Sequence, residues 1–333
     1  MFLSEKHFIH AFICATILLS ACSDDGFDES DFSSQSHPII HGSPATDEYD
    51  KAVVAIAVKS DQKNRVYCSG TLIRPNVVLT AAHCVINEEY FPFNSLFSQK
   101  KIVVLLGDDL NIPEKSLVFG IDRLSIHPSF VGEKNDHDLA LIWLDEEIPE
   151  SVAHPLPFLE DTTRLPIFAH EKRDIEFVGY GYDERDQDGI RLSVTGSIQL
   201  YCQMNGKGRC GMNNAYGEYI IVPEGSFIHD IQKGGPCSGD SGGPILTSIE
   251  GQKTVIGVVS YGDADCAGYA VTCSTADHLK WINDSIQPKK KNKSGCAIHD
   301  YSRMPQSNGG LFLIFVIYLV CLGVLRRFSH SSY

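Results

Sequence analysis

Short runs of apolar and β-branched residues recur along the middle of the chain, separated by turn residues. The clearest runs cover residues 52–58, 77–79, 102–106, 139–144 and 255–260. Runs of this length favour strands, and their number indicates antiparallel β-barrels rather than a parallel α/β sheet. Residues 276–287 instead predict a helix, because Leu279, Ile282 and Ile286 follow at spacings of three and four and share one face.

Length and charge narrow the class of protein. A chain of 333 residues could hold two domains, but all-β barrels often form one unit of about 200–250 residues. We therefore assign residues 39–288 to a single domain. The 42 acidic residues outnumber the 28 Lys and Arg, which argues against a nucleic-acid partner because such partners require a basic surface. Solubility of an exported protein explains this charge more simply than a steering role does.

The N-terminal segment carries an export signal. Residues 1–21 combine a lysine near the start with an apolar stretch around residues 12–19, which is typical of a signal peptide. The following Leu19-Ser20-Ala21-Cys22 resembles a bacterial lipobox, in which Cys22 is lipidated and becomes the new N-terminus. An ordinary signal peptide with a chance cysteine is the alternative. The acidic, serine-rich residues 22–38 then form a tether or propeptide.

The C-terminal segment carries a second membrane signal. Gly309-Gly310 precede the apolar residues 311–325, which are followed by Arg326-Arg327. The apolar run is slightly short for a spanning helix, and the arginines favour a cytoplasmic tail. The segment 309–333 resembles bacterial Gly-Gly sorting signals, which a rhomboid-type intramembrane protease clips; a permanent anchor is the alternative. The lysine-rich residues 289–308 read as a solvated linker, with membrane-surface contact as a lesser possibility. Together the two ends predict a protein exported to the surface of a Gram-negative-type bacterium, or secreted from it.

Three separated motifs contain side chains suited to nucleophilic catalysis. Ser241 lies in Gly239-Asp240-Ser241-Gly242-Gly243-Pro244, a glycine-rich turn that can expose the hydroxyl beside backbone N–H donors. A serine needs a base and a group that orients the base. His83 in Thr80-Ala81-Ala82-His83-Cys84 offers the first, and Asp138 before Leu139-Ala140-Leu141 offers the second.

These motifs, in the order His, Asp, Ser, resemble those of the chymotrypsin-like (trypsin family) serine proteases. The resemblance extends over residues 39–287 through Ile39-Ile40-His41-Gly42, Val178-Gly179-Tyr180-Gly181 and Ser260-Tyr261-Gly262. An α/β-hydrolase is a poor alternative because its serine precedes the acid and the histidine. The resemblance implies an all-β fold of two packed antiparallel Greek-key β-barrels with a C-terminal α-helix. It also implies a serine endopeptidase that cleaves proteins or peptides and uses no metal or other cofactor.

The resemblance assigns catalytic roles residue by residue. His83 is the general base, Asp138 fixes its tautomer and Ser241 is the nucleophile. The backbone N–H groups of Gly239 and Ser241 form the oxyanion hole, and Ser260 resembles the serine that hydrogen-bonds the aspartate. Because the base must be neutral, activity is expected to fall below about pH 6.5. Four other residues have side chains that could fill these catalytic roles, but their flanking residues favour His83, Asp138 and Ser241 instead. They are His127, His137, Asp136 and Ser238.

The resemblance also indicates the substrate pocket. Gly235 stands at its base where trypsin-like enzymes carry an aspartate, so an apolar preference at the residue before the cut bond (P1) is expected. Asp263 or Asp265 reaching in to select a basic residue is the rival hypothesis. The remaining wall positions are Ser260, Tyr261, Gly262 and Ala270.

Activation in the family frees an N-terminal amine that pairs with the aspartate before the catalytic serine. Here these residues are Ile39 and Asp240. Pro38 precedes Ile39 in place of the usual Lys or Arg, so self-activation is not expected. Another protease cutting after proline, trimming after a cut elsewhere, or a persistent zymogen remain open.

Cysteine usage agrees with an oxidising compartment. Of eleven cysteines, Cys14 and Cys321 lie in the membrane segments and Cys22 is the lipidation candidate, which leaves eight. The resemblance implies two disulfides, Cys68–Cys84 and Cys237–Cys266. Three pairings stay open for the other four cysteines, Cys202, Cys210, Cys273 and Cys296. No Cys-x-x-Cys or histidine-rich spacing accompanies them, so no metal site is expected.

Two other functional classes compete with an active protease. A catalytically silent binding protein on a protease scaffold usually shows a replaced triad residue, and His83, Asp138 and Ser241 are all present. A structural surface protein or adhesin would require repeats or additional binding modules, and no internal repeat is visible in the sequence.

Overall fold

The computed structural model describes residues 39, 41–60, 63–86, 93–132, 135–182, 187–214 and 217–287. The predicted signal peptide, the tether with Cys22, the lysine-rich linker and the C-terminal apolar segment lie outside the described residues. None of the helices in the described residues has the length and apolarity needed to cross a membrane.

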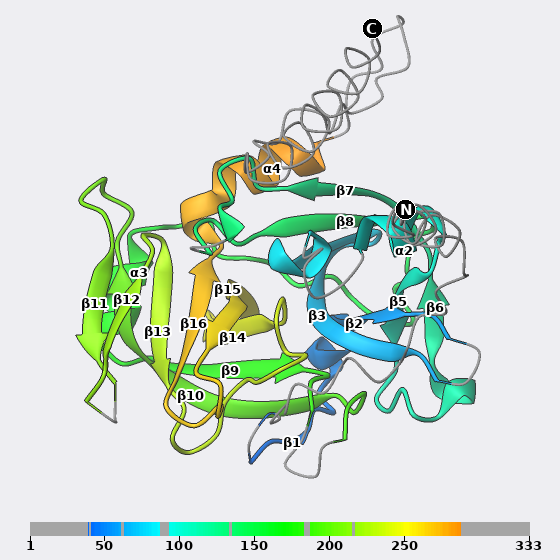
Figure 1. Cartoon of the computed structure of the whole chain (residues 1–333), viewed down its shortest axis with the longest axis horizontal. Helices are drawn as coiled ribbons and strands as arrows, with labels where there is room; N and C mark the ends of the chain where they lie inside the picture. Colours follow the sequence, from blue (N-terminus) through cyan, green and yellow to red (C-terminus); the bar gives the residue numbers. More distant parts are fainter. Residues whose placement is uncertain are drawn as a thin grey trace, which may run out of the picture. The chain divides into compact units, whose positions relative to one another are not determined.

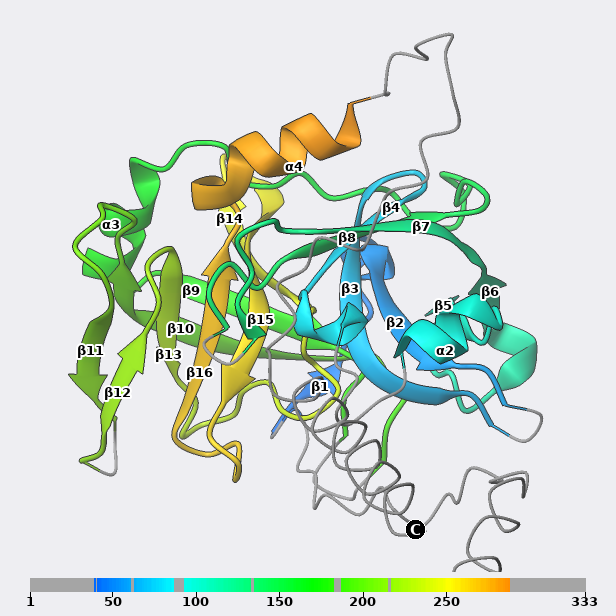
Figure 2. The same ribbon diagram turned by 45° about the horizontal axis from the view of Figure 1, so that its top comes forward.

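The first half of the described chain forms a curved antiparallel sheet (Figures 1 and 2). Its spatial order is β6-β5-β2-β3-β4-β8-β7. The strands are β2 Val53–Val58, β3 Arg65–Arg74, β4 Val77–Thr80, β5 Ile102–Leu106, β6 Leu117–Phe119, β7 Ile121–Ile126 and β8 Ala140–Leu144.

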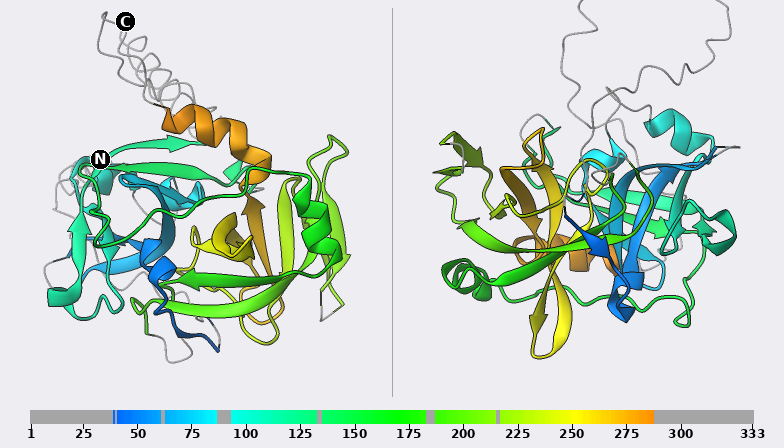
Figure 3. Two further views of the ribbon diagram at one scale, coloured as in Figure 1. Left: turned by 180° about the vertical axis from the view of Figure 1, so that it is seen from behind. Right: turned by 90° about the horizontal axis from the view of Figure 1, so that it is seen from below.

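The second half forms a closed barrel, which Figure 3 shows beside the first sheet. Its order is β10-β13-β16-β15-β14-β9, and β9 pairs again with β10 to close the ring, while β1 pairs with β10 from outside. The strands are β1 Ser43–Pro44, β9 Asp174–Gly179, β10 Leu192–Cys202, β13 Ser226–Asp230, β14 Pro244–Ile249, β15 Gln252–Gly262 and β16 Tyr269–Ser274. A separate hairpin contains β11 Cys210–Asn213 and β12 Tyr219–Val222.

The helical elements are short. They are the 3-10 turns η2 Glu48–Ala52, η3 His83–Val85, η4 Pro113–Lys115 and η6 Ala276–His278, and the helices α2 Phe93–Ser98, α3 Arg164–His170 and α4 Leu279–Ile286. The predicted helix at 276–287 therefore begins as a 3-10 turn and continues as α4. Its apolar face packs through the buried side chain of Ile282. The predicted fold class, all-β with two packed barrel-like sheets and a C-terminal helix, is confirmed.

The predicted strands agree closely with the observed ones. Residues 102–106 coincide with β5, and residues 255–260 lie inside the longer β15. The prediction for residues 52–58 began one residue too early, because Ala52 completes the 3-10 turn before β2. Apolar runs locate strands well since each buries its side chains in one contiguous core.

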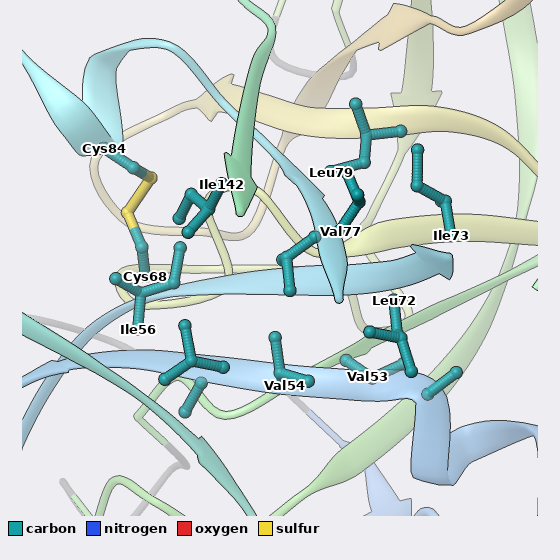
Figure 4. Close-up of a cluster of buried hydrophobic side chains, with 14 of the residues drawn as sticks. Val53, Val54, Ile56, Cys68, Leu72, Ile73, Val77, Leu79, Cys84 and Ile142 are labelled. Carbon is teal, nitrogen blue, oxygen red and sulfur yellow. A yellow bond between two sulfur atoms is a disulfide. The ribbon is translucent and has the colours of Figure 1, made fainter. Parts of the chain in front are cut away.

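The core of the first sheet explains why its strands read as uninterrupted apolar runs. In Figure 4, Val54 and Ile56 of β2 lie near Val77 of β4 and Ile142 of β8, with the Cys68–Cys84 disulfide at one end. All six residues of β2 are buried or nearly so. Complete burial of a side chain such as Val or Ile contributes about 1.5–3 kcal/mol. This packing fixes the strand ends that carry the candidate site.

Three disulfides occur in the described residues: Cys68–Cys84, Cys202–Cys210 and Cys237–Cys266. The first and third are the pairings that the family resemblance implies. The second is one of the pairings that the sequence left open. Cys273 carries a free, buried thiol, and Cys296 lies outside the described residues.

Candidate active site

His83 and Asp138 lie close together because His83 follows the end of β4 and Asp138 precedes the start of the neighbouring strand β8. β4 pairs with β8 so that Thr80 lies opposite Ala140, which brings the segment after β4 beside the residue before β8. His83 Nδ1 lies 2.8 Å from Asp138 Oδ2, and the backbone N–H of His83 donates to Asp138 Oδ1 at 3.0 Å. Two bonds thus fix both the ring and the main chain of the histidine.

Asp138 is completely buried yet surrounded by donors. Besides His83, the hydroxyl of Ser260 donates to Asp138 Oδ2 at 2.5 Å. Burial opposes the charged carboxylate, but His83 and these hydrogen bonds outweigh it and lower the pKa of Asp138. The structure therefore holds an ionised acceptor behind the imidazole.

The electrostatic environment of His83 has two opposing parts. Burial disfavours the imidazolium and tends to lower its pKa. The charge of Asp138 and the hydrogen bond to it prevail, so the pKa of His83 is raised above its usual 6.5. An imidazole with a raised pKa is a stronger proton acceptor, which suits a general base.

Ser241 lies on the loop between β13 and β14 and is partly exposed. The loop is bent by Gly239 and Gly242, with φ of 92° and 83°, which other residues rarely adopt. A Cβ on Gly242 would collide with the Thr80 side chain and the Ser69 carbonyl oxygen. The serine loop consequently packs directly against the segment that leads to His83.

Ser69, which the sequence did not single out, ties this loop to the first sheet. Its N–H donates to the Ser241 carbonyl oxygen at 2.8 Å, and its hydroxyl donates to the Gly239 carbonyl oxygen at 2.9 Å. The same hydroxyl accepts the N–H of Tyr180 at 3.0 Å. A serine within the apolar strand β3, next to a disulfide cysteine, was the available signal.

Two backbone N–H groups of the serine loop are candidate donors to a substrate. Within the part of the chain that the structure describes, the N–H groups of Gly239 and Ser241 donate to no protein acceptor. The positive φ of Gly239 and its contact with Gly181 hold that stretch of backbone in place. Two adjacent donors of this kind can bind a developing oxyanion.

Asp240, between these residues, is buried and accepts two backbone hydrogen bonds. Gly181 N–H donates to Oδ1 at 2.9 Å and Cys237 N–H donates to Oδ2 at 3.0 Å. Burial raises the pKa of Asp240 to about 7 despite these bonds. Among the described residues no Lys, Arg or His forms an ion pair with it. Ile39 is itself fully buried.

The residues expected to line the pocket lie on neighbouring elements. Gly262 of β15 pairs with Ala270 of β16, and a Cβ on the buried Gly235 would collide with Ile231. Tyr261 of β15 lies opposite Val271 of β16. The carboxylate of Asp263 accepts the N–H groups of Ala267, Gly268 and Tyr269, and Asp265 is exposed.

The rival residues lie elsewhere. His127 and His137 stack on each other, with ring centroids 4.9 Å apart, and Asp136 pairs with Arg209 at 2.7 Å. Ser238 is exposed on the serine loop. Of the described candidate residues, His83 and Ser260 are the ones whose side chains hydrogen-bond the buried carboxylate of Asp138.

Comparison with known proteins identifies the family of the chain. Residues 39–282 match the trypsin family. The chain is 28% identical over 238 residues to vitamin K-dependent protein C of Rattus norvegicus, covering 69% of this chain and 48% of the relative. Identity is 28% with coagulation factor XII of Bos taurus, over 66% of this chain and 36% of the relative. It is 25% with tissue-type plasminogen activator of Pongo abelii, over 67% and 40%. The chain thus spans about half, or less, of these relatives' length, and it belongs to the trypsin family of serine proteases, which are hydrolases.

Proposed function

We propose that this protein is an active serine endopeptidase that uses His83, Asp138 and Ser241. The observation that carries the proposal is the pair of hydrogen bonds from His83 Nδ1 and Ser260 Oγ to the buried Asp138 carboxylate. His83 takes the proton of Ser241 as the hydroxyl attacks the scissile carbonyl, and returns it to the leaving amine. Water then hydrolyses the acyl-enzyme.

The oxyanion of the tetrahedral intermediate is bound by the N–H groups of Gly239 and Ser241. Support comes from their lack of a protein acceptor in the described residues and from the positive φ of Gly239. Each donor of this kind contributes about 3 kcal/mol to the transition state in comparable sites.

The proposal is tested by covalent labelling. We expect a serine-directed fluorophosphonate to label the processed protein stoichiometrically, and peptide mapping by mass spectrometry to place the label on Ser241. Ser238, exposed on the same loop, serves as the internal control and should stay unmodified. A properly folded, processed chain that takes up no label would indicate a catalytically silent binding protein.

The pH dependence of activity follows from the pKa of His83. Its raised pKa means that the imidazolium persists above pH 6.5. As the pH is lowered, kcat/KM should therefore begin to decrease before pH 6.5 is reached. Below the apparent pKa we expect a decrease of about tenfold per pH unit, because the protonated ring cannot accept the serine proton. A rate that stays flat from about pH 4 to 8 with a peptide substrate would contradict His83 as the base.

An apolar P1 residue is the preferred substrate class. Ile231, which a Cβ on Gly235 would touch, and Ala270, which pairs with Gly262, are both buried and uncharged. Asp263 uses its carboxylate to hold its own loop, which disfavours the rival in which it selects a basic residue. Cleavage rates of matched Phe, Leu, Ala and Arg peptides test this, and a preference for Arg would refute it.

Activation is proposed to proceed through a new N-terminus at Ile39. Gly42, close to Ile39, packs so tightly on Leu192 of β10 that a Cβ on it would touch that side chain. Leu192 pairs with Gly179 of β9. Gly179 in turn lies so close to Asp240 that a Cβ on it would touch the carboxylate. A chain of packed neighbours therefore connects the Ile39 segment with the Asp240 carboxylate. A freed ammonium there would stabilise the charged carboxylate that burial disfavours. An N-terminus other than Ile39 on the fully active enzyme would exclude this step.

Export and anchoring rest on the sequence alone. The proposal is an N-terminal signal at residues 1–21, lipidation at Cys22, and a sorting or anchoring segment at residues 309–333 in a bacterial envelope. All three lie outside the described residues. Mass spectrometry of the mature protein checks them together, and a mature chain that retains residues 1–21 and carries no lipid would overturn the N-terminal part.

A further inference from the structure

Three histidines outside the candidate active site come together from distant parts of the chain. His127 directly follows β7, His137 lies three residues before the start of β8, and His278 ends η6 just before α4. Figure 1 shows α4 lying along the same end of the first sheet as β7 and β8. One potential ligand atom from each histidine lies within 4.8 Å of the others.

The hydrogen bonds of His278 define which of its nitrogens is available. Its Nδ1 lies 2.8 Å from the Ser274 carbonyl oxygen, which accepts only, so Nδ1 carries the proton and donates. The lone pair is left on Nε2, which faces His137 Nδ1 at 2.9 Å. Histidines that bind metals commonly donate their other ring nitrogen to a backbone carbonyl in this way.

Two of the three rings lie in surroundings that disfavour the charged imidazolium. Burial, reinforced by the neighbouring rings, lowers the pKa of His127 to about 3. Burial lowers the pKa of His278 to about 4 despite its bond to Ser274. A neutral imidazole is the form that coordinates a metal. Trp281 packs edge-on against His127, with ring centroids 5.0 Å apart, and limits the movement of that ring.

We propose that His127, His137 and His278 bind a zinc ion that joins the loop before β8 to the start of α4. Tetrahedral zinc with nitrogen ligands at about 2.0–2.1 Å places those nitrogens about 3.3 Å apart. The pair now 2.9 Å apart needs to separate only slightly, and the proton on His137 Nδ1 must move to His137 Nε2 so that the Nδ1 lone pair can coordinate the ion. His127 and His137 are half-exposed, so the ion can enter and water can complete the coordination.

Among the described residues, the groups near these histidines do not supply an alternative metal site. The Cys273 sulfur lies 3.9 Å from His278 Nδ1, the nitrogen engaged with Ser274, and is therefore not placed as a fourth ligand. His83 also lies near Cys68 and Cys84, but these two sulfurs form a disulfide and offer no thiolate. Imidazole ligands select zinc or copper over magnesium and calcium, which prefer oxygen.

The site would clamp a strained segment. His137 has φ of 55°, a left-handed conformation that is unfavourable for a residue with a side chain. Coordination fixes this residue and the beginning of α4 together, so zinc should stabilise the folded state. No metal site was expected from the sequence because no histidine-rich spacing accompanies its cysteines, and His137 and His278 are 141 positions apart.

Zinc chloride titrated into the metal-free full-length chain tests the proposal. We expect one zinc per chain by calorimetry and elemental analysis, and a Tm higher by about 5 °C at zinc concentrations 100-fold above Kd. His127→Asn and His278→Asn should each weaken zinc binding by about 100-fold. Asparagine is chosen because its side chain can retain the local bond to Ser129 or Ser274.

Matched variants distinguish this site from others. His154→Asn, an exposed histidine outside the cluster, and His83→Ala should bind zinc as the natural chain does. Should His278→Asn fail to fold, the half-exposed His127→Asn decides. The proposal is overturned if zinc does not bind, if binding survives both asparagine variants, if His83→Ala abolishes it, or if calcium stabilises the chain equally.

Discussion

Replacement of Ser241 by alanine is expected to lower kcat for a peptide substrate by about 10⁶-fold. The proposed reaction uses the Ser241 hydroxyl as its nucleophile, and alanine offers no hydroxyl for His83 to deprotonate. The fold should persist because Ser241 is partly exposed and its carbonyl oxygen, not its side chain, accepts the Ser69 N–H. Steady-state kinetics on chains that begin at Ile39, together with thermal unfolding of both proteins, measure this.

The matched control is Ser238→Ala on the same loop. It removes one hydroxyl from an exposed position and should change kcat by less than about threefold, as expected for a surface substitution. If Ser241→Ala retained activity within about tenfold of the natural chain, a different nucleophile would have to be sought.

The second large effect is expected from Asp138→Asn, which should lower kcat by about 10⁴-fold near neutral pH. The carboxylate accepts from both the ring and the main chain of His83. An amide nitrogen facing Nδ1 would require Nδ1 to accept, which moves the ring proton to Nε2. His83 could then no longer take the serine proton, although the size of the side chain is conserved.

Asp136→Asn is the control for this variant. Asp136 lies two residues earlier and forms a partly exposed ion pair with Arg209 at 2.7 Å. Such pairs contribute about 0–1 kcal/mol, so activity should stay within a fewfold of the natural chain. The assignment would be reversed if Asp136→Asn abolished activity and Asp138→Asn did not. The pH profile of Asp138→Asn provides an additional readout, because loss of the carboxylate also removes the interaction that raises the pKa of His83.

Much of the fold was predictable because strands leave a local signal. The run at 102–106 matches β5, since burial of each residue requires an apolar side chain there. The helix at 276–287 was predictable from its spacing of apolar residues, whereas its 3-10 start was not. The hairpin of β11 and β12 escaped prediction. Its exposed Tyr219 and Ile221 alternate with buried residues over only four positions, which is too short a pattern to separate from a loop.

The residues of the candidate site also differ in whether the sequence alone could identify them. His83, Asp138 and Ser241 could be named from motifs because each is flanked by distinctive neighbours within a few positions. Ser69 could not, because its role depends on bonds to residues about 170 positions away. The pairing of Cys202 with Cys210 was also undetermined, since cysteine counting allows several combinations.

The amino-acid order was sufficient to establish the fold class and the family, and to predict the side chains that carry out acyl transfer. Periodicity and motif context are short-range properties, and a few neighbouring residues encode them. The folded chain was required to show that Ser260 and His83 share one carboxylate oxygen and that Asp263 is committed to its own loop. It was also required to bring His127, His137 and His278 into one cluster. These arrangements depend on the register and closure of sheets, which place residues over a hundred positions apart within hydrogen-bonding distance, and no local pattern specifies that register.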